Sequence, residues 1–106
     1  MYNWYKVEDF TASDLEERKL REVIIGEKEI GLVKKDGKVF AFAGTCPHAG
    51  VRLCEGWMDA QGRIVCPEHL YRFDPANGRN TSGEGYKLRT YPVEEKDGFI
   101  YIGIIN

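Results

Sequence analysis

The chain has 106 residues, of which 42% are hydrophobic and 30% are charged, and this composition is that of a small globular protein rather than a disordered or fibrous one. Its 15 basic and 17 acidic residues are mixed along the chain and leave a formal net charge of -2, so no basic stripe indicates nucleic-acid binding. No apolar run is long enough to cross a bilayer, and the first residues lack a basic region followed by an apolar one. We therefore expect one domain over residues 1–106 that is cytoplasmic and binds neither nucleic acid nor membrane.

Hydrophobic residues recur mainly with a period of two, which predicts an all-β chain. In chain order, we expect an edge strand at residues 4–7 and then one helical turn with Ser13 as its N-cap, too short to be stable alone. Three strands follow, joined by turns at Gly26-Glu27 and Asp36-Gly37, and they predict an antiparallel meander over residues 19–25, 28–34 and 38–43.

The end of the chain predicts another hairpin, with strands at residues 88–94 and 99–104 around a Lys96-Asp97-Gly98 turn. Between the meander and this hairpin, residues 44–85 have little regular pattern, and the glycine-rich residues 81–85 indicate a loop. Scattered acidic residues, among them Glu55, Asp59 and Glu68, are interpreted as solvated surface. The chemistry of the chain is therefore expected in residues 44–85.

Two short motifs stand in that region. Cys46-Pro47-His48 and, after seventeen intervening residues, Cys66-Pro67-Glu68-His69 each supply one thiol and one imidazole. Each cysteine follows an apolar, strand-like run, so both motifs are expected in loops at strand ends. The proline after each cysteine fixes φ and stiffens the loop. The third cysteine, Cys54, lies outside both motifs and is interpreted as a small buried hydrophobic residue.

Two cysteines and two histidines suit either of two metal centres. Tetrahedral zinc is one of them, although zinc fingers place their two cysteines together and their two histidines together. The other is a [2Fe–2S] cluster in which thiolates bind one iron and imidazoles bind the other, and this centre requires the mixed loops seen here. The spacing favours the cluster and leaves zinc as the alternative.

The order Cys-Pro-His, then Cys-Pro-x-His, then Phe73 and residues 74–78, resembles the Rieske iron–sulfur family. This resemblance implies a Rieske fold of three stacked antiparallel sheets, with a two-loop cluster-binding subdomain at about residues 44–80. It also implies one [2Fe–2S] cluster per chain, with one iron on Cys46 and Cys66 and the other on His48 and His69.

Within the family, the chain resembles the ferredoxins of bacterial aromatic-ring-hydroxylating oxygenase systems. Val51 and Glu68 stand where respiratory members carry an additional disulfide, and Leu70-Tyr71 stands where they carry Gly-Ser. The resemblance implies a monomeric one-electron carrier that passes electrons from an NAD(P)H-dependent flavoprotein reductase to a terminal oxygenase through transient contacts. With few donors to the sulfurs, its potential is expected at the low end of the Rieske range of about -150 to +300 mV.

Two features complete the interpretation. The chain has only two histidines, both assigned to the cluster, so no second metal site of an oxygenase can form and we expect no catalytic residues. A small cluster-bearing subunit of a reductase complex, similar to the small subunit of nitrite reductase, remains the alternative function. Leu70 departs from the family pattern, in which glycine often follows the second histidine, and a bulky residue is expected to avoid positive φ there.

Overall fold

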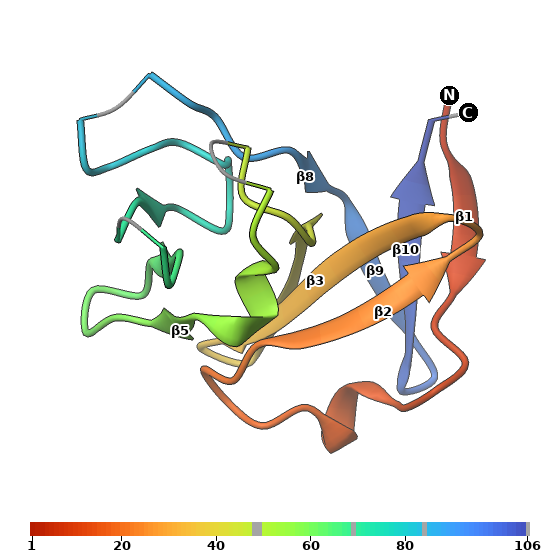
Figure 1. Cartoon of the computed structure of the whole chain (residues 1–106). Coiled ribbons are helices and arrows are strands. Elements are labelled where there is room, and N and C mark those ends of the chain that lie inside the picture. The colour runs from red at the N-terminus through yellow and green to blue at the C-terminus, as the bar shows by residue number, and fades with distance from the viewer. Residues whose placement is uncertain (48–49, 69, 84, 106) are drawn as a thin grey trace.

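The computed structural model describes residues 1–47, 50–68, 70–83 and 85–105, and its strands form three antiparallel sheets (Figure 1). The terminal sheet has the order β1 (Asn3–Lys6), β10 (Phe99–Ile104) and β9 (Val93–Lys96). The central sheet has the order β2 (Arg21–Ile25), β3 (Lys28–Lys35), β4 (Lys38–Ala43) and β8 (Thr90–Tyr91). The small sheet has the order β5 (Trp57–Met58), β6 (Ile64–Val65) and β7 (Arg72–Phe73). The predicted all-β class with three antiparallel sheets is confirmed.

The predicted meander is confirmed as β2, β3 and β4, with strand ends within two residues of expectation. Asp36 and Gly37 both have positive φ, 53° and 79°, as a two-residue type I′ turn requires. Asp97 and Gly98 repeat this conformation, with φ of 53° and 83°, between β9 and β10. These turns fix the register of both hairpins, because a two-residue loop leaves only one pairing of the flanking strands.

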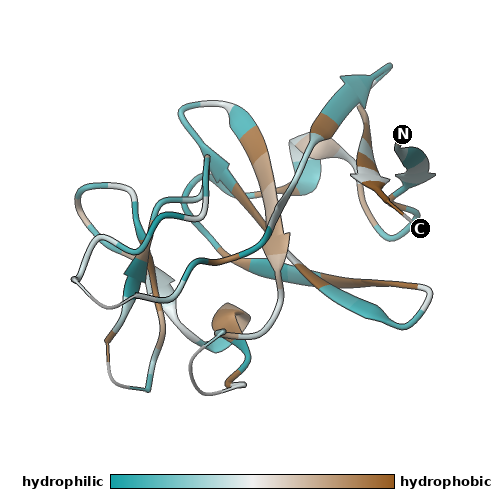
Figure 2. Cartoon of the chain, turned by 90° about the horizontal axis from the view of Figure 1, so that it is seen from above, coloured by the Kyte–Doolittle hydropathy of each residue, from teal (hydrophilic) through white to brown (hydrophobic). Residues whose placement is uncertain are grey.

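The central sheet is the middle layer of the molecule. Leu32 and Ala41 face the core that the terminal sheet covers, whereas their neighbours Val33 and Phe42 face a second core beneath the small sheet. Successive side chains of a strand point to opposite faces, so this alternation means that the central sheet is covered on both sides. The middle of β3, residues 30–33, is accordingly buried without interruption, and Figure 2 shows the colouring of the strands by hydropathy from above.

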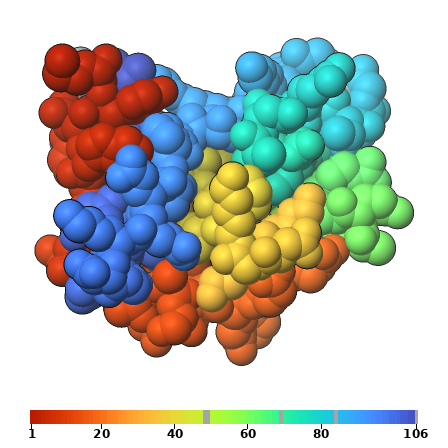
Figure 3. All heavy atoms as spheres, turned by 180° about the vertical axis from the view of Figure 1, so that it is seen from behind, coloured from red at the N-terminus to blue at the C-terminus, as the bar shows by residue number. Residues whose placement is uncertain are grey.

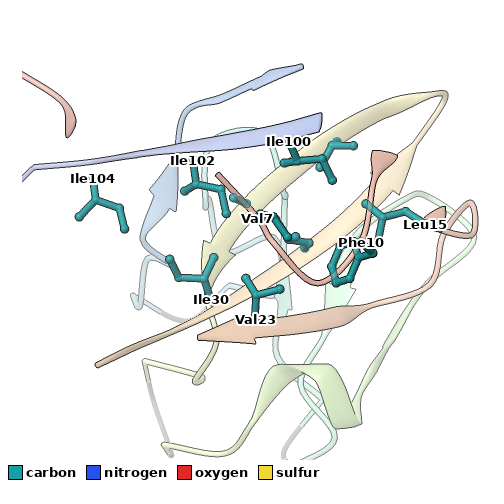
Figure 4. Close-up of a cluster of buried hydrophobic side chains, with 11 residues drawn as sticks. Val7, Phe10, Leu15, Val23, Ile30, Ile100, Ile102 and Ile104 are labelled. Atoms are coloured by element: carbon teal, nitrogen blue, oxygen red, sulfur yellow. The ribbon is translucent and has the colours of Figure 1, made fainter. Parts of the chain in front are cut away.

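The first core fills the space between the terminal and central sheets. Ile100 and Ile102 of β10 face Val23 of β2 and Ile30 of β3, and Val7 and the segment after it close the open side (Figure 4). Each of these five side chains is at most 5% exposed. Burying such a side chain stabilises a fold by roughly 1.5–3 kcal/mol, so this core anchors the body from which the ligand loops extend.

The predicted strand at residues 88–94 is wrong in one respect, because the structure divides it at Pro92. β8 before the proline pairs with β4 of the central sheet, and β9 after it pairs with β10 of the terminal sheet. Proline has no backbone N–H to give to a ladder, so the chain changes sheets at this residue. This crossing connects the lobe that holds the chain ends with the teal and cyan lobe that follows β7 (Figure 3).

The helical turn lies slightly earlier than predicted, as the 3-10 helix η1 (Ala12–Asp14) with Thr11 as its N-cap instead of Ser13. The Thr11 backbone N–H donates to the Asp14 carboxylate at 2.9 Å, and the Asp14 N–H donates to the Thr11 carbonyl at 3.0 Å. Thr11 is the N-cap because the Asp14 carboxylate bonds back to the Thr11 backbone, which is the reciprocal pairing of a capping box. A second 3-10 turn, η2, spans Leu53–Glu55. Among the described residues, no helix has the length and apolar character needed to span a membrane.

Candidate metal centre

The two cysteine motifs lie in loops that are closed in the same way. The Cys46 N–H donates to the Val51 carbonyl at 2.7 Å, and the Cys66 N–H donates to the Tyr71 carbonyl at 2.9 Å. Each cysteine is therefore bonded to the fifth residue after it. The second loop joins the paired strands β6 and β7, and the first follows β4 and is pinned by an isolated bridge between Thr45 and Arg52. Both cysteines thus stand at the base of a short, hydrogen-bonded loop, as the sequence predicts.

The loops also share a left-handed residue four positions after the cysteine. In the first loop this residue is Gly50, with φ of 69°, and in the second it is Leu70, with φ of 57°. The expectation that Leu70 avoids positive φ is therefore wrong. A closing bond to the fifth residue reverses the chain within a few residues, and in both loops a left-handed residue just before the acceptor completes that reversal. Leu70 adopts this conformation although its side chain disfavours it, and that side chain remains 48% exposed.

The thiols of Cys46 and Cys66 are buried and face each other. The residues are 2% and 0% exposed, they are not joined in a disulfide, and their side chains are close enough to share a hydrogen bond. Burial raises the pKa of the Cys66 thiol to about 11; the Glu68 N–H opposes this effect and the neighbouring Cys46 thiol adds to it. A buried thiol such as Cys66, which ionises unfavourably alone, is suited to a metal ion, because the ion replaces the proton and supplies the opposite charge.

Apolar side chains surround this pair of thiols. Both cysteines belong to the second core, with the fully buried Leu53, Ile64, Phe73 and Leu88 packed in the same cluster. Thiolate ligands in apolar surroundings fit an iron–sulfur cluster, whose potential depends on burial and on hydrogen bonds to sulfur. The donor set and its surroundings therefore fit the [2Fe–2S] group that the sequence predicts.

The other two predicted ligands, His48 and His69, lie outside the described residues. Within residues 1–47, 50–68, 70–83 and 85–105, no group of three or more His, Cys, Asp or Glu side chains forms a metal site. The structure thus brings together Cys46 and Cys66, the two predicted ligands that it describes.

Cys54 is not the buried residue that the sequence suggested, because it is only partly buried. Its Sγ lies 3.8 Å from Oε2 of Glu22 on β2. The side chain stands on η2, after the first loop, and takes no part in the second core. Its partial exposure follows from its position in a 3-10 turn, where Leu53 faces the core instead.

Asp59 has a structural role that the sequence analysis missed. Its side chain is only 11% exposed, and its Oδ2 accepts hydrogen bonds from Nε of Arg63 and Nε of Arg72, each at 3.1 Å. Its Oδ1 accepts the backbone N–H groups of Gln61 and Arg63 at 3.0 and 2.9 Å. Burial acts to raise the pKa of Asp59, but the N–H and guanidinium of Arg63 outweigh it and hold the pKa below the ordinary value. Asp59 therefore joins the β5–β6 hairpin to β7.

Comparison with known proteins identifies the family. A model of the Rieske [2Fe–2S] domain matches residues 3–92. The ferredoxin component of the alkene monooxygenase system of Xanthobacter autotrophicus is 33% identical over 79 residues, which are 74% of this chain and 65% of that relative. The match therefore spans slightly less than two thirds of the relative's length.

Solved structures agree on the fold. In a complex of reduced oxygenase and oxidized ferredoxin of carbazole 1,9a-dioxygenase, one chain superposes with a TM-score of 0.82 at 29% identity, over 92% of this chain and 99% of that one. A nitrite reductase small subunit of Mycobacterium tuberculosis superposes with a TM-score of 0.87 over 100% and 98% of the two chains, but at 18% identity it shows likeness of fold alone. With the family model covering most of its length and two buried thiols at the matching loops, the chain belongs to the Rieske [2Fe–2S] domain family.

Proposed function

We propose that Cys46, His48, Cys66 and His69 hold one [2Fe–2S] cluster and that the chain is a one-electron carrier between a flavoprotein reductase and a terminal oxygenase. The observation that carries this proposal is the pair of facing, buried thiols at the base of two identically closed loops. A cytoplasmic, monomeric carrier without catalytic residues of its own is part of the proposal.

The chain's own residues prepare this site for electron transfer. When bound, the cluster accepts one electron and later releases it. The backbone bonds from Cys46 to Val51 and from Cys66 to Tyr71 hold the two sulfurs on fixed loops, so little needs to rearrange when the charge changes. The apolar cluster around the sulfurs excludes water, which disfavours the added negative charge and supports a potential at the low end of the Rieske range.

Contact with an electron partner is proposed at the tip of the two loops. Pro47 and Leu70, each next in sequence to a proposed histidine ligand, are exposed to solvent. An oxygenase as the acceptor is supported by the similar ferredoxin that was solved with its oxygenase. The flavoprotein reductase rests on the resemblance to oxygenase ferredoxins. A carrier that must leave each partner after one electron is expected to use a small interface at this tip.

The alternative, a permanent cluster-bearing subunit of a reductase complex, shares this site but not the transient contacts. The similarity to the nitrite reductase small subunit lies in the fold alone and does not favour this alternative. Gel filtration of the chain with a candidate reductase separates the two functions. A carrier elutes alone at micromolar concentration, whereas a subunit co-elutes with its partner.

The proposed cofactor is tested on freshly purified protein by assays of iron and acid-labile sulfide, with optical and low-temperature EPR spectra before and after dithionite. We expect a red-brown protein with iron and sulfide in the ratio of a [2Fe–2S] cluster and, after reduction, the EPR signal of a Rieske centre. Colourless protein that holds zinc, and keeps it through anaerobic reconstitution with iron and sulfide, would contradict the proposal and indicate a structural zinc domain.

A further inference from the structure

The second ligand loop contains a conformation that its sequence does not favour. Gly50 and Leu70 occupy equivalent positions in the two loops, four residues after the cysteine, and both are left-handed. Glycine adopts positive φ freely, but an L-residue with a side chain is disfavoured there because its Cβ approaches the following carbonyl oxygen. The second loop therefore needs a stabilising contact at Leu70 that the first loop does not need at Gly50.

Arg72 supplies such a contact. Its Nη1 donates to the Leu70 carbonyl at 3.4 Å, while its Nε donates to the Asp59 carboxylate at 3.1 Å. The rigid fork of the guanidinium allows one side chain to hold both acceptors at the same time. Leu70 directly follows the proposed ligand His69, so this contact acts on the backbone next to that ligand.

Asp59, to which Arg72 donates, is itself held in place by other hydrogen bonds. Two backbone N–H groups of its own hairpin fix Oδ1, as described above. Arg18, from the segment before β2, donates from Nη2 to the Asp59 carbonyl at 2.5 Å and ties the hairpin to the body of the molecule. The orientation of Arg72 is therefore set by contacts that lie outside the second ligand loop, at Asp59 and through it at Arg18.

We propose that Arg72, anchored by Asp59, is a positioning residue of the proposed cluster. It holds Leu70 in the left-handed conformation and thereby orients the second loop, whose Cys66 and His69 are proposed to bind the cluster. This inference rests on the proposed function and deepens it. Arg72 does not touch the cluster in this proposal. Its effect passes through the Leu70 backbone.

The chain offers a matched control in Arg63. Arg63 donates to the same Oδ2 of Asp59 from its Nε at the same distance of 3.1 Å. Its remaining side-chain hydrogen bonds in the described part of the chain go to Gln61 and Thr81 and not to Leu70. Lysine at position 72 or 63 keeps the positive charge but lacks the planar guanidinium that donates to two acceptors at once. A difference between Arg72→Lys and Arg63→Lys therefore reports on the Leu70 contact and not on charge or on Asp59.

The experiment uses the full chain purified with its cluster. Iron release to a chelator is followed by the loss of visible absorbance, the EPR spectrum of the reduced state reports cluster geometry, and the melting temperature reports overall folding. For Arg72→Lys we expect iron release to be about tenfold faster and the EPR g-values to shift, because losing a residue that orients a metal ligand weakens metal binding by about this factor or more. For Arg63→Lys we expect release and EPR spectra like those of the unsubstituted chain.

Leu70→Gly provides the rescue. Glycine adopts positive φ without a stabilising contact from Arg72. Arg72→Lys should therefore change iron release and the EPR spectrum much less in the Leu70→Gly chain than in the parent. If Arg72→Lys alone fails to fold, recovery of folded, cluster-bearing protein in the double variant supports the proposal, and failure of the double variant overturns it.

The results distinguish failure of the positioning role of Arg72 from failure of the proposed electron-carrier function. Equal release rates and EPR spectra for Arg72→Lys and Arg63→Lys, or an undiminished effect of Arg72→Lys in the Leu70→Gly chain, would overturn the positioning role and leave the electron carrier intact. An unsubstituted chain without iron, sulfide or a Rieske EPR signal would instead remove the proposed function itself.

Discussion

The Sγ of Cys54 lies 3.8 Å from Oε2 of Glu22, and Oε1 of the same carboxylate accepts a hydrogen bond from Arg52 at 2.7 Å. Glu22 stands on the edge strand β2, with its side chain 13% exposed, so these contacts join the central sheet to the turn after the first ligand loop. Partial burial raises the pKa of the Cys54 thiol, the negative charge of Glu22 adds to this effect, and Arg52 opposes it. Cys54 is therefore a poor nucleophile near neutral pH.

We expect Glu22→Gln to make Cys54 more reactive toward iodoacetamide at pH 8. The substitution removes a negative charge beside the thiol, so the pKa falls toward its ordinary value and the thiolate fraction rises. Labelling is followed by mass spectrometry of the native chain. A lowered pKa makes the variant and parent rates converge above the thiol pKa, whereas a merely more accessible thiol reacts faster by the same factor at every pH. Equal rates at pH 8 would contradict the role given to Glu22.

Gly78→Ala should destabilise the chain much more than Gly37→Ala, although both glycines have positive φ, 76° and 79°. A Cβ at Gly37 meets no atom within 4 Å, whereas one at Gly78 would lie 1.8 Å from the Leu88 carbonyl oxygen. We expect a loss of about 1 kcal/mol at Gly37 from backbone conformation alone, and about 2–3 kcal/mol more at Gly78 from forced overpacking. Urea unfolding of both variants measures this difference, and equal losses would contradict the close approach of residues 78 and 88.

Asp59→Asn should lower stability by about 2 kcal/mol at pH 7, because hydrogen bonds from charged groups to the carboxylate are lost. The pKa of Asp59 is lower in the folded chain than its ordinary 3.8. Its contribution is therefore complete above the unfolded pKa and is lost as the pH falls through the folded pKa. The difference between parent and variant in urea unfolding should stay constant from pH 7 to about 5 and shrink below about pH 4. A difference that persists unchanged at pH 3 would show that the carboxylate charge is not its source.

Cys66→Ser should abolish incorporation of the iron–sulfur cluster, whereas Cys54→Ser should leave iron and sulfide content unchanged. Both substitutions exchange sulfur for oxygen in a nearly equal volume, but only Cys66 faces a second buried thiol. Iron, sulfide and the visible spectrum are compared at equal protein concentration, and circular dichroism verifies the fold of each variant. Cluster content that falls equally in both would remove the distinction between the two cysteines.

The parts of the fold that were predictable are those specified by neighbouring residues. Asp36-Gly37 and Asp97-Gly98 determine two hairpins by themselves, and the strands beside them extend far enough to show their period. The strands of the small sheet have only two residues each, too few for any period, and the family resemblance alone predicted their sheet. A single strand was wrongly predicted over residues 88–94, because the apolar pattern continues through Pro92 although the chain changes sheets there.

The candidate site was predictable in its motifs but not in its support. Cys46 and Cys66 were evident because a thiol followed by proline and histidine is distinctive. Asp59 and Arg72 were not, because they lie thirteen residues apart and meet only through the pairing of β6 with β7. The left-handed Leu70 was missed because the intrinsic preference of leucine argues against positive φ, whereas the closing bond from Cys66 to Tyr71 depends on the pairing of two strands.

The pairing of β1 with β10 brings Asn3 opposite Ile104, so the two ends of the chain leave the molecule together (Figure 1). They do so at the side away from both cysteine loops. A tether, a surface linker or a fused protein attached at either end would therefore leave the loop tip facing outward. The domain can therefore be linked covalently to an electrode or to an enzyme through either end, without redesign of the face proposed for electron transfer.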